Sequence, residues 1–153
     1  MPTGRATKLQ PAGLPLRIVD GRVLYSHVVV VEAGRQVFVS GQLARNAKGE
    51  LVGKGDMRAQ IRQVGENIKT ALAAAGASLD ALVKTTTYTT DIDAYFKHVD
   101  LRMEYFGAAM PTSIAVAGGL TALDDAASSI IASSRLIRLS DQRRSPSCDR
   151  RLA

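Results

Sequence analysis

The chain has 153 residues, of which 46% are hydrophobic and 22% are charged, a composition typical of one globular domain. No apolar run approaches the ~20 residues of a membrane-spanning helix, and the N-terminus lacks the apolar stretch of a secretory signal. We therefore expect a cytoplasmic protein. The only cysteine, Cys148, excludes an internal disulfide.

The net charge of +6 comes mainly from the two ends of the chain. We expect residues 1–17 to be a flexible basic segment, 18–140 to form the domain, and 141–153 to be a disordered basic tail, because both ends lack apolar periodicity. Basic tails strengthen binding to phosphates. Their arginines are not interleaved with aromatic residues, however, so the sequence does not favour a nucleic-acid partner.

The first predicted elements are two strands. Residues 22–32 are rich in β-branched residues and, with 36–40, predict an antiparallel hairpin that turns at 33–35. Ser40 and Gly41 then break the strand pattern where a backbone N–H could face a pocket. Residues 46–49 have the composition of a turn, and Asp56 is suited to cap a helix.

Two amphipathic helices follow, with a strand between them. Apolar residues recur at spacings of three and four over 57–75 and over 92–106, with Gly76 and Gly107 as stop signals and Asp91 or Asp93 as the second cap. A threonine-rich strand is predicted at 83–90, and strands near 113–116 and 129–139 complete the chain. The order ββαβαββ predicts an α+β fold in which both helices lie on one face of a mixed sheet.

Neither histidine belongs to a metal-binding pattern. His98 falls on the polar side of the second predicted helix and is interpreted as solvated, whereas for His27, at a strand start, a pocket role and a structural role remain open. Two isolated histidines and one tail cysteine do not form a ligand cluster. The sequence around Gly53 and Gly55 is interpreted as a turn because it lacks the Walker A pattern. We expect no metal and no cofactor.

Several segments together resemble the Rid (YjgF/RidA) family. They include Val39-Ser40-Gly41-Gln42, the sequence Gly49-Glu50-Leu51-Val52-Gly53 before the Asp-capped helix, Tyr25-Ser26-His27 and Pro111-Thr112-Ser113. The resemblance covers most of the chain, from about Tyr25 to Leu139. It implies a chorismate-mutase-like fold and a homotrimer whose small-molecule clefts lie between subunits, lined by the Val-Ser-Gly-Gln turn and a tyrosine of the first strand.

The chain departs from the family pattern at the residues that carry deamination. In active deaminases of the family an arginine binds the substrate carboxylate and a glutamate of the last strand orients water. Ser113 occupies the arginine position here, and no glutamate follows Glu104. Tyr25 and His27 are both candidates for the position of the family's first-strand tyrosine. Asp93 stands where the family usually has an asparagine at the start of the second helix. The chain thus resembles a branch that lacks the deaminase arginine.

The resemblance and these departures lead to one hypothesis with two alternatives. As a hydrolase or deaminase, the protein would act on a small imine, enamine or related C–N compound other than the standard 2-aminoacrylate type. Gly41, Tyr25 and His27 would be catalytic, and Ser40, Gln42 and Ser113 would bind the substrate. The first alternative is a trimer that binds a small molecule without turnover. The second, an endoribonuclease or translation inhibitor, has only the basic tails in its support.

Overall fold

The structure is a computed structural model that describes residues 6–31 and 36–118 and the backbone of 131–137. The predicted tail 141–153 lies outside these residues. The elements in chain order are β1 (Ala6–Leu9), β2 (Ile18–Val19), β3 (Arg22–Val23), β4 (Val28–Val31), β5 (Gln36–Gln42), α1 (Met57–Ala74), the short 3-10 helix η1 (Leu79–Ala81), β6 (Leu82–Thr89), α2 (Ile92–Phe96), α3 (Val99–Phe106), β7 (Thr112–Ala117) and β8 (Ile131–Ile137).

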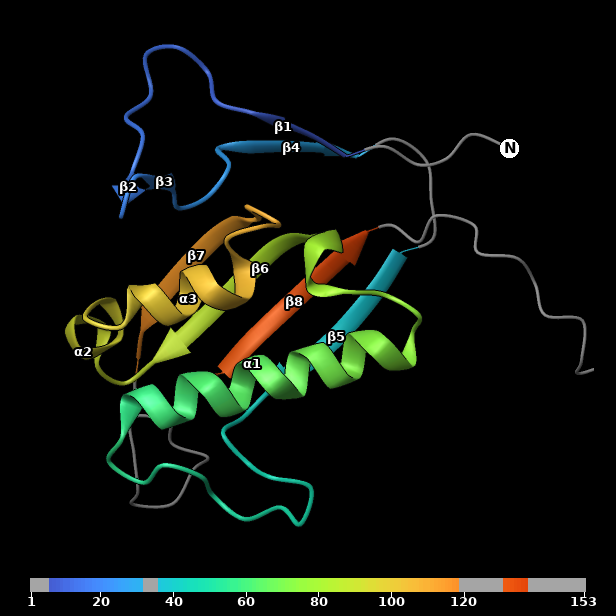
Figure 1. Ribbon diagram of the computed structural model, residues 1–153, viewed down its shortest axis with the longest axis vertical. Helices are drawn as coiled ribbons and strands as arrows, with labels where there is room; N and C mark the ends of the chain where they lie inside the picture. Colours follow the sequence, from blue (N-terminus) through green and yellow to red (C-terminus); the bar gives the residue numbers. More distant parts are fainter. Residues whose placement is uncertain (1–5, 32–35, 119–130, 138–153) are drawn as a thin grey trace, which may run out of the picture.

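The central sheet has four strands in the order β5-β8-β6-β7. β8 pairs antiparallel with both β5 and β6, whereas β7 pairs parallel with β6, so the sheet is mixed. The helices α1, α2 and α3 lie on one face of it (Figure 1). The predicted α+β architecture is confirmed, and its order ββαβαββ corresponds to β4 through β8 with the second helix divided in two.

Helix α1 supplies most of the core because its apolar residues face the sheet. Met57, Ile61, Val64, Ile68 and Leu72 are buried on this side. Asp56 caps the helix, its Oδ1 accepting a hydrogen bond from the backbone N–H of Ala59 at 3.0 Å. Gly76, with a φ of +70°, ends the helix in a Schellman motif in which the N–H of Ala77 donates to the carbonyl of Leu72.

The second predicted helix is divided between residues 96 and 99. Asp91 rather than Asp93 caps α2, accepting from the N–H of Ala94 at 2.8 Å. The most buried residues are Tyr95 in α2 and Leu101 in α3, which do not belong to the single apolar stripe that we predicted. α2 contacts β7, whereas α3 packs against α1 and η1, and the two short helices join at His98. His98 is therefore half-buried at the N-cap of α3 and not on a solvated helix face.

The predicted first hairpin is wrong in its pairing. β4 pairs with β1, inside the segment 1–17 that we expected to be flexible, and these strands form a two-stranded sheet separate from the main one (Figure 1). β5 pairs instead with β8. Valines at every position of β4 provide no alternation that would fix a partner or register, so the sequence could not identify β1 as the neighbour.

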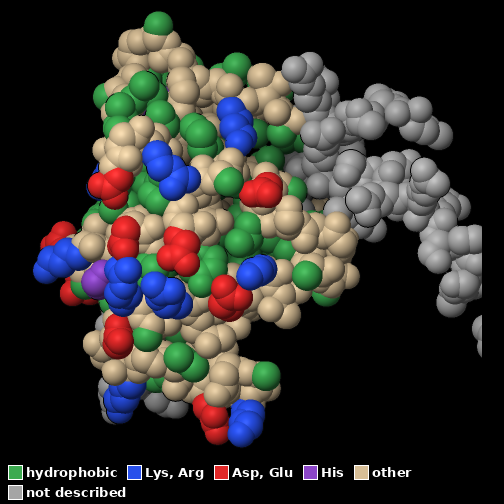
Figure 2. Space-filling view, in the orientation of Figure 1, with side chains coloured by type: hydrophobic (Ala, Val, Ile, Leu, Met, Phe, Trp, Pro, Cys, Tyr) green, Lys and Arg blue, Asp and Glu red, His purple; other side chains and the backbone are tan. Residues whose placement is uncertain are grey.

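The two faces of the main sheet differ in chemistry. Charged side chains of both signs cover the helix side (Figure 2). On the opposite face, alternation along the strands directs Phe38, Tyr88, Ile114 and Val116 away from the core, and these residues are 38–60% exposed. Among the described residues, no helix is long and apolar enough to cross a membrane.

Candidate functional site

The predicted site residues lie in two separate places. Gly41 and Gln42 border a groove between the end of β5 and α1, whereas Tyr25 and Ser113 line a cavity beside α2 and α3. β5, which carries Gly41 and Gln42, and β7, which carries Ser113, are the opposite edges of the main sheet. One chain therefore does not bring the predicted residues together.

The groove begins at an irregularity in β5. Val39 pairs with Ser134 and Gln42 with Ala132, so β5 has one more residue than β8 over this interval, as in a β-bulge. A bulge leaves its extra residue outside the regular ladder and is frequent beside active sites. The amide of Gln42 folds back across it and donates to the carbonyl of Ser40 at 3.1 Å. The regular ladder of β5 is thus interrupted at Ser40 and Gly41, where the sequence predicted a break in the strand pattern.

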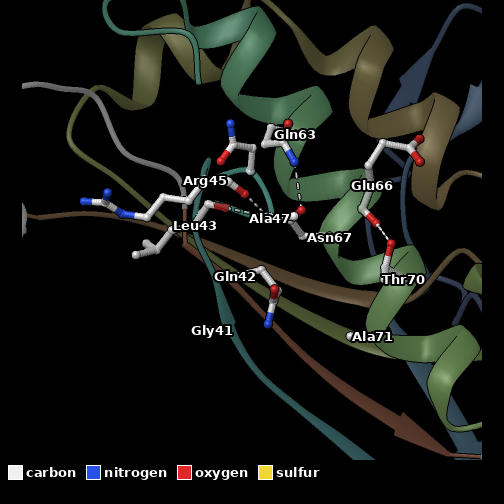
Figure 3. A pocket seen from close by; sticks show the side chains of 11 residues that line it. Gly41, Gln42, Leu43, Arg45, Ala47, Gln63, Glu66, Asn67, Thr70 and Ala71 are labelled. Atoms are coloured by element: carbon white, nitrogen blue, oxygen red, sulfur yellow. Dashed lines mark hydrogen bonds between the residues drawn. The ribbon is translucent and has the colours of Figure 1, made fainter. Parts of the chain in front are cut away.

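The groove has a volume of about 630 Å³ and is polar along its α1 side. Figure 3 shows Gln63, Glu66, Asn67 and Thr70 of α1 opposite Gly41 and Gln42 of β5. Ser40 is not among the residues that line it. The groove is open to solvent, so this face alone does not exclude water from a reaction.

Asn67 fixes the loop that borders the groove. Its Nδ2 donates to the carbonyls of Leu43 at 2.8 Å and Arg45 at 2.9 Å, while its Oδ1 accepts from Gln63 at 2.8 Å (Figure 3). Both donor hydrogens and the acceptor are therefore used. Asn67 ties the chain leaving β5 to the middle of α1, which holds the bulge in place.

The predicted turn at 46–49 completes this loop. Asn46 Oδ1 accepts from the N–H groups of Lys48 and Glu50, and Gly49 has a φ of +82°. Gly53 and Gly55 also have positive φ, and the N–H of Asp56 donates to the carbonyl of Gly53, so this segment is a turn leading into α1.

The second place is a cavity of about 70 Å³. Its lining residues come from three parts of the chain and are Arg17, Leu24, Tyr25, Tyr95, Phe96, Arg102, Ser113 and Ala115. Ser113 Oγ lies 3.2 Å from the hydroxyl of Thr85, its register partner on β6. Tyr25 thus lies in the same cavity as Ser113, the residue at the family's arginine position.

His27 lies next to Tyr25 but is not among the residues that line the cavity. The two rings make a T-shaped contact with centroids 5.3 Å apart. His27 Nε2 is 3.1 Å from the carbonyl of Pro15, and since a carbonyl only accepts, Nε2 carries a proton. In the neutral ring Nδ1 is then the acceptor. The side-chain amide of Gln10 binds the backbone on both sides of Ser26, fixing Tyr25 and His27 relative to each other.

Arg102 is a residue of this cavity that sequence reasoning missed. It is only 4% exposed, and its Nη1 donates to the carbonyl of Leu24 at 2.7 Å. Nη2 is buried without a hydrogen-bond partner among the described residues. Burial lowers the pKa of Arg102. The interaction with Tyr95 partly opposes this effect, and the positive charge of Arg17 lowers the pKa by a smaller amount. Residue 102 lies at helical spacing from Val99 and Phe106, but a charged side chain at this position does not by itself indicate burial.

The charges between α1 and α3 are exposed and paired. Arg58 binds Asp100 at 2.7 Å, which lowers the pKa of that carboxyl, and Arg62 lies 3.9 Å from Glu104. Tyr105 donates to Glu66 Oε1 at 3.0 Å, and burial together with this bond raises its pKa to about 12. Exposed pairs of this kind contribute little to stability. Within the described ranges no three metal-ligating side chains come together.

Comparison with known proteins agrees with this fold. The family described as endoribonuclease L-PSP matches residues 19–127. A RutC family protein of Pyrococcus horikoshii is 44% identical over 87 residues, covering 56% of this chain and 68% of its own. The 2-iminobutanoate/2-iminopropanoate deaminase of Bos taurus is 34% identical over 92 residues, covering 60% and 65%. A solved Rid-family structure from Yersinia pestis superposes with a TM-score of 0.69 at 27% identity over 87% of this chain and 98% of its own.

The family match covers more than half of the chain, and the structural match covers both proteins almost completely. The Ser40–Gly41 bulge at the end of β5 lies within the family match, and so do the residues that line the cavity beside β7 except Arg17. The chain therefore belongs to the Rid (YjgF, endoribonuclease L-PSP) family and has its chorismate-mutase-like fold.

Proposed function

We propose that the protein is a homotrimeric hydrolase that deaminates a small imine, enamine or related C–N compound, at sites formed between subunits. The observation that carries this proposal is the division of the candidate residues between the two edges of the sheet. Three inter-strand steps separate these edges, a distance of about 14 Å at the usual spacing of ~4.8 Å. A small substrate cannot contact both groups within one chain.

A neighbouring subunit supplies the missing half if the edge carrying β5 meets the edge carrying β7. The exposed apolar side chains on the outer face of the sheet, Phe38, Tyr88, Ile114 and Val116, support such an assembly. Apolar patches of this kind are typical of protein interfaces. The fold already buries its other face under helices, so a second copy is the natural cover for this one.

The chemistry follows from the groups on each side. The N–H of Gly41 would hold the attacking water or the developing oxyanion, and Ser40 and Gln42 would contact the substrate. From the neighbour, the phenol of Tyr25 or the free Nδ1 of His27 would relay the proton, with Ser113 beside the substrate. The bovine relative is named as a deaminase of 2-iminobutanoate and 2-iminopropanoate, which supports hydrolysis of a C=N bond as the reaction class.

The substrate differs from the 2-aminoacrylate type in this proposal. Ser113 offers a neutral hydroxyl where the active deaminases have a guanidinium, and its Oγ already lies within hydrogen-bond distance of Thr85. The lack of a guanidinium at position 113 and of a glutamate after Glu104 favours one alternative. In this alternative the protein is a trimer that binds the small molecule without converting it.

A substrate screen with the purified full chain tests the proposal. Imines, enamines and acylated amines are assayed for ammonia or amine release, and the same compounds are assayed for binding. Gly41→Ala should reduce turnover of a confirmed substrate at least tenfold, because the added methyl obstructs the approach to the backbone. Gly41 does not have a positive φ, so its backbone conformation is one that alanine adopts. Gly118→Ala is the matched control, since its added Cβ meets open space.

Two results decide between the alternatives. Binding of compounds without any turnover would establish the non-catalytic trimer and contradict the enzyme. Full activity of Gly41→Ala on a confirmed substrate would remove the bulge from the mechanism.

A further inference from the structure

The segment 10–15 contacts both side chains that the proposed function considers as proton relays, and it precedes the residues 19–127 that match the family. The contact comes first from the side-chain amide of Gln10. Its Nε2 donates to the carbonyl of Tyr25 at 2.8 Å, and its Oε1 accepts from the backbone N–H of His27 at 3.2 Å. The relative position of Tyr25 and His27 therefore depends on a residue outside the family match.

The ring of His27 is fixed by a second contact with the same segment. Nε2 lies 3.1 Å from the carbonyl of Pro15, and because a carbonyl only accepts hydrogen bonds, Nε2 carries the proton. The ring also contacts Tyr25 edge to face, with centroids 5.3 Å apart and an interplanar angle of 82°. The hydrogen bond made by one ring nitrogen of a histidine determines the role of the other. In the neutral ring the lone pair is consequently on Nδ1.

We propose that Gln10 and the carbonyl of Pro15 are positioning groups for His27, and that His27 rather than Tyr25 relays the proton. This inference rests on the proposed hydrolysis. An imidazole gains and loses a proton near neutral pH, whereas a phenol stays protonated there. One hydrogen bond to the backbone of His27 and one to its ring keep a single tautomer in a single orientation. A general base whose second nitrogen is held by a fixed acceptor has this arrangement.

The relay balances in two steps for an imine. In the first step, water held at the Gly41 N–H of the neighbouring subunit attacks the imine carbon, and its proton passes to Nδ1 of His27. The electron pair of the C=N bond moves to nitrogen, which takes the proton from the imidazolium. In the second step, the hydroxyl of the carbinolamine gives its proton to Nδ1 as the C=O bond forms and the C–N bond breaks. The departing nitrogen takes this proton and leaves as ammonia.

Nitrogen NMR of the full chain with isotope-labelled histidine tests the geometry without a substrate. The chain has only two histidines, so the signals of His27 are those that His27→Gln loses. The neutral ring should have its hydrogen on Nε2, and Gln10→Ala should raise the fraction with hydrogen on Nδ1. Leu14→Ala is the matched control, because it shortens an exposed side chain of the same segment and should leave the tautomer unchanged. A hydrogen on Nδ1 in the wild type would overturn the proposal.

Kinetics on a confirmed substrate test the role of these groups. His27→Gln should lower kcat by about a hundredfold or more, because proton transfer by a positioned side chain contributes at least that much. Gln10→Ala should lower kcat by about tenfold and change KM less than about twofold, because a misplaced relay slows the chemical step and leaves binding intact. Leu14→Ala should keep both constants.

The failure of this inference is distinguishable from the failure of the proposed function. Absence of turnover by the wild type would contradict the proposed function and this role with it. Turnover by the wild type, with kcat unchanged in His27→Gln or in a folded Gln10→Ala, would overturn this inference alone. A merely structural Gln10 would lower the melting temperature and leave kcat unchanged. If Gln10→Ala does not fold, His27→Gln and the tautomer of the wild type decide the matter.

Discussion

Asn67 should be the residue that stabilises the groove most directly. Its amide donates to two carbonyls of the loop after β5, at 2.8 and 2.9 Å, from the middle of α1. Replacing it with alanine removes both bonds and the acceptor of Gln63. The loop would lose its connection to the helix while the core beneath stays intact.

The magnitude follows from these contacts. Two neutral hydrogen bonds contribute about 2 kcal/mol net, at about 1 kcal/mol each. Alanine recovers roughly 0.5 kcal/mol because it favours the helix more than asparagine does. Asn67→Ala should therefore lower the free energy of unfolding by about 1.5 kcal/mol, or Tm by about 3–6 °C for a domain of this size.

Asn67→Asp provides a sharper comparison, because aspartate has nearly the same size and shape as asparagine. Its carboxylate faces two carbonyl oxygens and donates to neither, so it should destabilise the protein more than alanine does at pH 7. The repulsion raises the pKa of the new carboxyl in the folded state, so the folded state binds the proton more tightly. Stability of this variant relative to the wild type should then fall as pH rises through the acidic range.

Urea unfolding followed by circular dichroism, at one protein concentration and at pH 4.5 and 7, measures both effects. Concentration is held constant because assembly stabilises the folded state by mass action. A loss below 0.5 kcal/mol in Asn67→Ala, or Asn67→Asp equal to wild type at pH 7, would refute the role assigned to the amide.

Three further predictions concern chemistry. Turnover of 2-aminoacrylate should be negligible, because position 113 lacks the arginine that would bind the carboxylate through two charged hydrogen bonds. Each such bond contributes roughly 1.5–3 kcal/mol, so its productive binding should be weaker by about a hundredfold or more. Rates typical of the active deaminases would contradict this prediction. On a confirmed substrate, kcat is compared for Tyr25→Phe and His27→Ala. The variant that loses the greater part of kcat identifies the side chain that relays the proton, and full activity in both variants would exclude both side chains from that role. In an absorbance titration Tyr105 should have a pKa of about 12, and Glu66→Gln should lower it. The free energy of unfolding should fall as pH rises from about 10 through that value. The prediction is contradicted if the titration of Tyr105, identified as the signal that Tyr105→Phe loses, has the ordinary tyrosine pKa.

The sequence predicted the elements whose signals are local. Asp56, Gly76, Asp91 and Gly107 mark helix ends through hydrogen bonds to residues at most a few positions away, and each lies where the pattern indicated. The Ser40–Gly41 break in β5 is likewise visible in the chain itself. It lies at the observed irregularity of the ladder.

The sequence could not predict the features that depend on distant partners. β1 pairs with β4 over residues 6–9 and 28–31, and nothing in four consecutive valines specifies that neighbour. Arg102 contacts Leu24, 78 positions away, so no signal near residue 102 in the sequence marks its burial. A charged residue in an amphipathic helix is ordinarily interpreted as solvated, so only the structure identifies the cavity around it.

The central claim is that the site forms between copies of the chain. The mass of the protein in solution tests this claim most directly. Multi-angle light scattering on a size-exclusion column should give three times 16.3 kDa for the wild type at micromolar concentration. Phe38→Glu, which places a charge in the apolar outer face of the sheet, should shift the mass toward that of one chain. A wild-type mass of 16.3 kDa under these conditions would contradict both the trimer and the intersubunit site.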